Sequence, residues 1–304
     1  MVITSTVDQT VDYLISKFKH KLNFYRINTD KLQNYQIKVT TSGVIINGPI
    51  GEITADYIDA VYYRKPMLPD MTLYDYKFHS LMQRDILTLI EGIAEISGKV
   101  ILTKPSILKR AENKVIQLHF ASRLGFVIPA SLITNDCTDA SSFCNNQTSI
   151  VKPLSVGRIL ELQKINYIQT NIVDQAIPIQ NLEIAPSYFQ KYVDKDEEYR
   201  VTIVGRSVFT VKIQSSDKVD WRRTTAKVHY TKASIPNTLV NQCLDLMKLL
   251  DINYGAFDFI LKDGVYYFLE VNPNGQWLWL EQALSLNISS AIIDHLLGGN
   301  TIYE

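Results

Sequence analysis

The sequence predicts an α/β (α+β) fold in which helices alternate with short strands and several strands pair as antiparallel hairpins. Residues 199–213 (YRVTIVGRSVFTVKI) form two strand-like runs around Gly205-Arg206, which predicts one hairpin. Residues 255–272 (GAFDFILKDGVYYFLEVN) predict a second hairpin around a Lys-Asp-Gly turn. Residues 80–96 carry their apolar side chains on one helical face. With 304 residues, of which 46% are hydrophobic and 20% charged, the chain can bury a sizeable core.

Three units are expected along the chain. Residues 1–104 alternate strands and helices, among them a strand in AVYYRKP (60–66) that Pro66 stops, and predict a small α/β domain. Residues 105–186 begin with a helix over 113–126 that Gly125 ends. Residues 187–304 contain both hairpins.

Composition excludes several classes of function. Lysines and arginines number 31, as do the acids, so no global field favours nucleic acid or an anionic membrane. The N-terminus lacks a signal peptide pattern, and no run of eighteen apolar residues predicts a membrane span. Cys137, Cys144 and Cys243 form no CxxC pair, and we expect reduced thiols in a cytoplasmic protein.

The second hairpin ends in FLEVNPNG (268–275), where two polar residues follow an apolar run. Strand side chains alternate between faces, so the loop length decides which residues share a side. A two-residue turn would put Asp258 opposite Leu269 and separate the acids. A three-residue loop would place Asp258, Glu270 and Asn272 on one face, and we favour this register.

The favoured register leaves one face entirely apolar. That face would hold Phe257, Phe259, Leu261, Val265, Tyr267, Leu269 and Val271, with Ile260, Tyr266 and Phe268 beside the acids. Carboxylate and amide oxygens suit Mg²⁺, which takes one or two carboxylates together with substrate phosphates. The alternative is that Asp258 and Glu270 are solvated residues of a surface hairpin.

Nucleotide phosphates would need cations from elsewhere, because the chain has neither a P-loop nor a kinase-type glycine loop. Lys114 and Lys152 are candidates, and the loop after Lys152 offers backbone donors near Ser155 and Gly157. The main chain of 191–193 could pair with an adenine rim. Each of these residues could equally be a solvated surface residue.

The order of these motifs resembles the ATP-grasp superfamily. More narrowly, the sequence resembles the ATP-grasp ribosomal peptide maturases, the microviridin-type or graspetide macrocyclases. The motifs that carry this resemblance are YYRKP (62–66), KPLSVG (152–157), EYRVTIVG (198–205), VDWRR (219–223) and LEVNPNGQWLWLE (269–281). The resemblance covers nearly the full length. It implies an ATP-grasp fold with an N-terminal pre-ATP-grasp α/β domain, followed by two ATP-grasp subdomains.

The resemblance also implies residue roles. Lys114 and Lys152 would contact phosphates, with Ser155 and Gly157 nearby. An adenine-binding linker would comprise Gln190, Lys191, Tyr192 and Val193, and Glu198 or its neighbour Glu197 would bind ribose. Arg200, Lys212 and Arg222 would face the transferred phosphate or the substrate carboxylate. Asp258, Glu270 and Asn272 would hold Mg²⁺.

The implied reaction is ATP-dependent ligation. A carboxylate of a precursor peptide would be phosphorylated to an acyl phosphate, which a Ser or Thr hydroxyl or a Lys amine displaces to close a ring. The expected partner is a precursor peptide with a leader and an acidic core, steered by basic residues over 206–223. The resemblance also suggests a homodimer. Two alternatives remain: an ATP-grasp amino-acid or glutamate ligase, and a non-catalytic nucleotide-binding protein.

Overall fold

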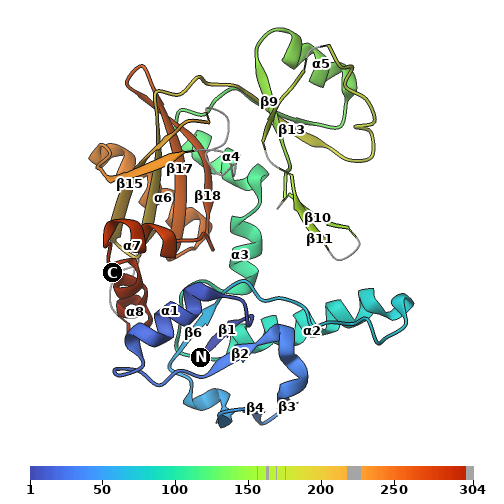
Figure 1. Cartoon of the computed structure of the whole chain (residues 1–304), viewed down its shortest axis with the longest axis vertical. Helices are drawn as coiled ribbons and strands as arrows, with labels where there is room; N and C mark the ends of the chain where they lie inside the picture. Colours follow the sequence, from blue (N-terminus) through green and yellow to red (C-terminus); the bar gives the residue numbers. More distant parts are fainter. Residues whose placement is uncertain (156, 162–163, 169, 175, 218–226, 299–304) are drawn as a thin grey trace.

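The computed structural model describes residues 1–155, 157–161, 164–168, 170–174, 176–217 and 227–298 (Figure 1). The predicted site residue Arg222 lies outside the described residues, as does the rest of 218–223 at the end of the basic segment 206–223.

The N-terminal unit is built on a parallel sheet with the strand order β2-β1-β6-β7. Asp8 caps the first helix, because its side chain accepts hydrogen bonds from the amides of Thr10 and Val11. The elements are β1 (Val2–Thr4), α1 (Gln9–Phe18), β2 (Arg26–Asn28), a 3-10 helix (Thr29–Asn34), β3 (Gln36–Thr40), β4 (Gly43–Gly48), β5 (Gly51–Thr54), a second 3-10 helix (Ala55–Tyr57), β6 (Ala60–Tyr63), α2 (Tyr76–Ile96) and β7 (Val100–Ile101). Strands β3, β4 and β5 form a separate antiparallel sheet.

Two connecting helices, α3 (Pro105–Ala111) and α4 (Lys114–Arg123), lead from the N-terminal unit to a central unit (Figure 1). Its sheet has the order β12-β9-β13-β8. The elements are β8 (Ser131–Thr134), α5 (Cys137–Asn145), β9 (Ser149–Lys152), the hairpin β10 (Arg158–Glu161) and β11 (Lys164–Tyr167), β12 (Asn171–Ile172) and β13 (Ser187–Lys191). Because β13 pairs with β8 and β9, residues 187–191 join the central sheet, whereas we expected a new unit to begin at Ser187.

The C-terminal unit contains a five-stranded antiparallel sheet with the order β16-β15-β14-β17-β18. Strands β14 and β15 form the hairpin predicted around Gly205-Arg206, since Val204 pairs with Ser207. The elements are β14 (Glu197–Val204), β15 (Ser207–Ser215), β16 (Val228–Lys232), α6 (Asn237–Leu250), β17 (Tyr254–Lys262), β18 (Val265–Asn272), α7 (Leu278–Leu284) and α8 (Ile288–Leu296).

The two faces of this sheet pack against different parts of the chain. One face, which carries Phe257, Phe259 and Phe268, packs against the apolar side of α6. The opposite face shares a core with the N-terminal unit: Val204, Tyr254 and Ala256 belong to the same buried cluster as α1, α7 and α8. Burial of this apolar surface joins the first and last segments of the chain into one body.

The predicted three-residue hairpin loop is wrong. Lys262 pairs with Val265, so Asp263 and Gly264 form a two-residue turn, with positive φ angles of 49° and 76°. Such angles match the right-handed twist of paired strands, and Asp-Gly is a preferred sequence for this turn. The register then predicts that Asp258 should face Leu269, yet Asp258 pairs with Glu270.

A β-bulge accounts for the difference. The register shifts between Asp258 and Phe259, so that Leu269 is the extra residue between Glu270 and Phe268. Between the turn and the bulge, the two-residue turn reverses the predicted faces: Tyr266 and Phe268 lie on the core face, while Val265 and Tyr267 lie on the face of Asp258. The convergence of Asp258 with Glu270 is confirmed, although by another route than the one expected.

No helix among the described residues combines the length and apolar character needed to cross a bilayer. Cys137, Cys144 and Cys243 are all free thiols, as predicted.

Candidate nucleotide and metal site

The site is centred on two neighbouring strands of the large sheet. Arg200 of β14 is the register partner of Asp258 of β17, and its Nε lies 2.7 Å from Asp258 Oδ1. Both residues are buried. The two atoms form an ion pair, although Nε–H is not aligned with Oδ1 as a hydrogen bond.

Glu270 and Asn272 continue this group on β18. Asn272 Nδ2 donates to Glu270 Oε1 at 3.2 Å, and Lys114 Nζ donates to Glu270 Oε2 at 2.9 Å. Lys114 is the first residue of α4, a helix that Asn113 caps. Gln117, one turn later, holds the edge of β18, since its side-chain amide bonds both the N–H and the C=O of Val271. The helix therefore fixes Lys114 beside Glu270.

The central sheet contributes a second set of polar residues. Lys152 Nζ donates to Gln190 Oε1 at 3.0 Å and lies 4.4 Å from the centroid of the Tyr188 ring. Gln190 Nε2 in turn donates to Ser131 Oγ and Tyr188 OH. The predicted residues Lys152 and Gln190 are therefore in direct contact.

An electrostatic effect links the two sheets. Burial raises the pKa of Tyr188 to about 12, and the negative charge of Glu270 adds to this shift, whereas a hydrogen bond with Ser131 opposes it. Tyr188 thus lies within electrostatic range of Glu270. Lys114 of α4 contacts this carboxylate directly, whereas Lys152 of β9 contacts Gln190 and the Tyr188 ring.

The donor set fits a divalent metal bound together with phosphates. Asp258, Glu270 and Asn272 supply hard oxygen ligands, and cations already neutralise both carboxylates. Within the described residues, no group of three or more His, Cys, Asp and Glu side chains could hold a metal by itself. Two carboxylates and one amide match Mg²⁺, which leaves further coordination to phosphate oxygens and water.

Glu198 and Glu197 lie on opposite faces of β14, because side chains alternate along a strand. Glu198 shares the face of Arg200, since both alternate with Tyr199 on β14, and it forms a buried ion pair with Lys195. Glu197 lies on the opposite face, where Lys212 Nζ is 3.0 Å from its Oε1. Hydrogen bonds from Tyr199 and Lys212 lower the pKa of Glu197.

The same parity places Lys212 away from the predicted catalytic group. Lys212 pairs with Tyr199, whereas Arg200 pairs with Val211, so Lys212 and Arg200 point to opposite faces of the sheet. The expectation that both face one transferred phosphate therefore does not agree with the register.

Two main-chain amides of the predicted adenine-binding linker (190–193) already donate hydrogen bonds to neighbouring segments of the protein. The Lys191 amide donates to Ala130 O and the Tyr192 amide to Thr148 O, both at 2.8 Å. Main-chain contacts to adenine would thus fall to other groups, such as the Val193 amide.

Gly157 has a packing reason to be glycine. A Cβ there would lie 2.6 Å from Pro153 Cγ and 2.8 Å from Ile168 O, and Gly157 O accepts from the Ile168 amide at the base of the β10–β11 hairpin. The predicted phosphate contacts of Ser155 and Gly157 stay predictions.

Sequence reasoning missed Lys65 and Glu112. Lys65 follows the buried Arg64 in an exposed, left-handed conformation (φ 46°). Its pKa is lowered to about 8, chiefly by desolvation and also by the positive charges of Arg64 and Arg200, while the negative charges of Asp8 and Glu112 oppose the shift. Desolvation raises the pKa of Glu112, which Lys65 partly offsets. Both residues expose part of their surface, while the surrounding protein desolvates their charged groups. The YYRKP motif contains Lys65 and was the available signal.

Lys65→Gly is expected to raise the free energy of unfolding at neutral pH by about 1 kcal/mol, because a left-handed conformation costs a lysine more than a glycine. A lysine whose folded-state pKa is lowered destabilises the fold below that pKa, and the penalty fades as pH rises toward the unfolded value. Lys65→Met is the matched control, since it removes the amine and keeps the backbone strain. Denaturant unfolding at neutral and alkaline pH separates the two effects; a gain with Met as large as with Gly would contradict a backbone contribution.

Comparison with known proteins places this geometry in context. The sequence matches no protein-family model. It also matches no curated protein. Solved structures do match over nearly the whole chain. A RiPP-associated ATP-grasp ligase from Chryseobacterium gregarium, in complex with ADP and a leader and core peptide, is 26% identical, with a TM-score of 0.85 over 98% of this chain and 96% of that one.

Two macrocyclases from Microcystis aeruginosa are also similar. MdnC, bound with the precursor peptide MdnA, is 28% identical with a TM-score of 0.86, and MdnB is 25% identical with a TM-score of 0.78; both alignments cover 98% of each chain. The comparisons confirm the predicted ATP-grasp fold and the predicted resemblance to ribosomal peptide maturases.

Proposed function

We propose that this chain, which has the fold of the RiPP ATP-grasp ligases and macrocyclases, is an ATP-dependent, ADP-forming peptide macrocyclase. It would join Asp or Glu side chains of a ribosomal precursor peptide to Ser or Thr hydroxyls as esters, or to Lys amines as amides. The observation that carries the proposal is the contact of Arg200 with Asp258 beside the group formed by Lys114, Glu270 and Asn272.

The reaction has two steps. A carboxylate oxygen of the peptide bonds to the γ-phosphorus of ATP, and the bond to the β,γ-bridging oxygen breaks, so that ADP leaves with the electron pair. The hydroxyl or amine then bonds to the acyl carbon, and phosphate leaves as the nucleophile loses its proton. One ring therefore costs one ATP and removes the mass of one water from the peptide.

Different residues of the site would bind the metal, the phosphates and the peptide carboxylate. Asp258, Glu270 and Asn272 would hold Mg²⁺, which offsets charge on the transferring phosphoryl group when it is bound. Arg200 lies beside Asp258 and would orient the peptide carboxylate and stabilise developing negative charge. Lys114 and Lys152 would bind phosphates, and Gln190 keeps Lys152 in position. The predicted roles of Lys212 and Arg222 remain to be tested by substitution.

A peptide partner is supported by the neighbouring structures, which hold leader and core or precursor peptides. An acidic core would be attracted by Lys65 and Arg200, since the positive charge of Arg200 is close enough to contribute to the lowered pKa of Lys65. Because the reaction consumes ATP, we assign it to the cytoplasm.

A homodimer is supported by helix α2, which projects from the N-terminal unit in Figure 1. Its first turns and the segment before them expose a group of large apolar side chains: Leu73, Tyr74, Tyr76, Phe78 and Leu81. Apolar groups of this kind mark interfaces. Light scattering of wild type and of Leu73→Glu/Leu81→Glu tests this assignment; equal masses would contradict it.

The proposed reaction is tested with a candidate precursor, namely any small acidic peptide whose reading frame neighbours the gene. Enzyme, MgATP and this peptide should release ADP and yield products lighter by one water mass per ring, as measured by mass spectrometry. Products that gain amino-acid masses would instead establish the amino-acid ligase. Nucleotide binding without peptide-stimulated ADP release would establish a non-catalytic nucleotide-binding protein.

Glu198→Gln is expected to raise the ATP concentration for half-maximal activity by about tenfold, because a buried carboxylate accepting from ribose hydroxyls contributes about 1.4 kcal/mol or more. Glu197→Gln is the comparison, since Glu197 lies on the other face of β14. Steady-state ADP release at varied ATP measures both. A larger effect at Glu197 would reverse the assignment.

A further inference from the structure

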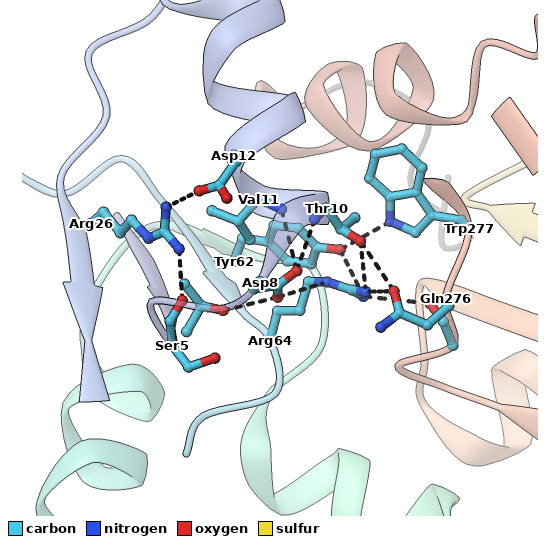
Figure 2. A network of polar contacts seen from close by, with 12 residues as sticks. Ser5, Asp8, Thr10, Val11, Asp12, Arg26, Tyr62, Arg64, Gln276 and Trp277 are labelled. Carbon is cyan, nitrogen blue, oxygen red and sulfur yellow. Dashed lines mark hydrogen bonds and ion pairs between the residues drawn. The ribbon is translucent and has the colours of Figure 1, made fainter. Parts of the chain in front are cut away.

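Arg64 is a fully buried arginine at the end of β6, and its first partner is an acid of the same unit. Its Nε lies 3.1 Å from Asp8 Oδ2, and both side chains are removed from solvent (Figure 2). Asp8 also accepts from Thr4 and caps α1. A buried guanidinium is costly unless its donors are satisfied.

The remaining donors reach the opposite end of the chain. Arg64 Nη2 donates to Gln276 Oε1, and Nη1 lies 3.4 Å from Gly275 O. Thr10 Oγ1 donates to the same Gln276 oxygen at 3.1 Å, as Figure 2 shows. The neighbouring Trp277 Nε1 donates to Tyr62 OH at 3.3 Å. The N-terminal unit therefore holds the segment 275–277 from one side.

From the other side, this segment is attached to the candidate metal site. It begins three residues after Asn272, and the Gly275 amide donates to Asn272 O at 3.3 Å. A Cβ at Gly275 would lie 2.8 Å from Ala256 Cβ and 3.3 Å from Asn272 Cβ, so the loop packs tightly on the pair formed by Ala256 and Asn272. Tyr254 OH donates to Gly275 O at 3.0 Å. A displacement of Gly275 would be transmitted directly to Asn272.

We propose that Arg64 is a positioning residue which, through Gln276 and Gly275, holds Asn272 in place beside Glu270 for binding of the divalent cation. The inference rests on the proposed function, in which Asn272 is a Mg²⁺ ligand. It gives a joint role to two sequence segments, YYRKP and NPNGQW, that are distant in the chain and have no other shared role in the site.

Substitutions at Gln276 test the inference, because they leave the Arg64–Asp8 ion pair intact. Gln276→Leu removes the acceptor of Arg64 and Thr10, whereas Gln276→Glu keeps an acceptor and adds a charge partner. Binding of a fluorescent ADP analogue is measured over a Mg²⁺ series, which reports on the metal without requiring turnover. We expect the Mg²⁺ concentration for half-maximal binding to rise by about tenfold in Gln276→Leu and to stay within about threefold of wild type in Gln276→Glu.

Lys17→Met is the matched control. It breaks another contact between the N-terminal unit and the C-terminal helices, the Lys17–Glu281 pair, which is separate from the contacts that lead from Arg64 through Gln276 and Gly275 to Asn272. It should lower the melting temperature and leave the Mg²⁺ dependence unchanged. A shift in Gln276→Leu no larger than in Lys17→Met overturns the inference. Wild-type protein whose ADP binding is independent of Mg²⁺ overturns the proposed function as well.

Discussion

Glu270→Gln is expected to lower peptide-stimulated ADP release by about 10³-fold, the largest effect that we anticipate from a single substitution. The variant keeps the size of the side chain and removes the charge that would bind Mg²⁺. It also leaves Lys114, whose Nζ lies 2.9 Å from Glu270 Oε2, without its anionic partner. Release of ADP is measured at saturating ATP and peptide, with Mg²⁺ raised until the rate no longer changes.

Asp245→Asn is the control for this substitution. Asp245 is an exposed acid of α6, the helix that packs on the opposite face of the sheet from Asp258 and Arg200. Loss of one surface carboxylate there should leave the rate within about twofold of wild type. If Glu270→Gln retains the wild-type rate, the assignment of Glu270 as a metal ligand is wrong, and the proposed mechanism loses its central residue.

The sequence could predict the participants of the site better than their geometry. Asp258, Glu270 and Asn272 were grouped as candidate ligands from the pattern of acids in an apolar hairpin, and the structure brings them together, yet the favoured loop length was wrong. The bulge at Leu269 is fixed by distant segments: the Phe268 amide donates to Val127 O, and Gln117 binds Val271. These contacts on either side of Leu269 come from α4 and the segment after it. Local hairpin rules do not contain that information.

The position of Lys212, by contrast, could have been deduced. The hairpin turn at Gly205-Arg206 was predicted correctly, and a two-residue turn there pairs position 199 with 212. Counting along both strands places Lys212 beside Tyr199, on the face opposite Arg200. The same count separates Glu198 from Glu197. Strand parity therefore assigns residues to faces wherever the turn is known and no bulge intervenes.

Contacts between the units lay beyond sequence reasoning. Arg64 and Gln276 are 212 residues apart, and no periodicity or turn relates them. Both occur in the segments that carry the family resemblance, but the resemblance does not say that these segments touch. Likewise, Trp277 is fully buried in the core that joins α1, α7 and α8, and the pattern QWLW does not by itself specify that position.

Glu281 illustrates how such a contact stabilises the fold. Its carboxylate is 3% exposed and accepts hydrogen bonds from Tyr13, Lys17 and Ser289. Burial by itself raises the pKa of Glu281, but the hydrogen bonds from Lys17 and Ser289 outweigh burial, so the net pKa is lowered. A carboxyl group with a lowered folded-state pKa stabilises the protein above its unfolded pKa, and this contribution is lost as pH falls through the folded pKa.

Lys17→Met is therefore expected to lower the free energy of unfolding by about 3 kcal/mol at neutral pH, because it leaves a buried carboxylate without its cation. In the variant, the pKa of Glu281 should rise, and protonation in acid should relieve the unpaired charge. The difference from wild type should consequently shrink as pH falls below the range in which Glu281 ionises. Denaturant unfolding of both proteins at neutral and acidic pH measures this difference. An equal loss at both pH values would show that the stem of Lys17, which packs with its amine 5.5 Å from the Tyr13 and Phe18 ring centroids, stabilises the fold through contact alone.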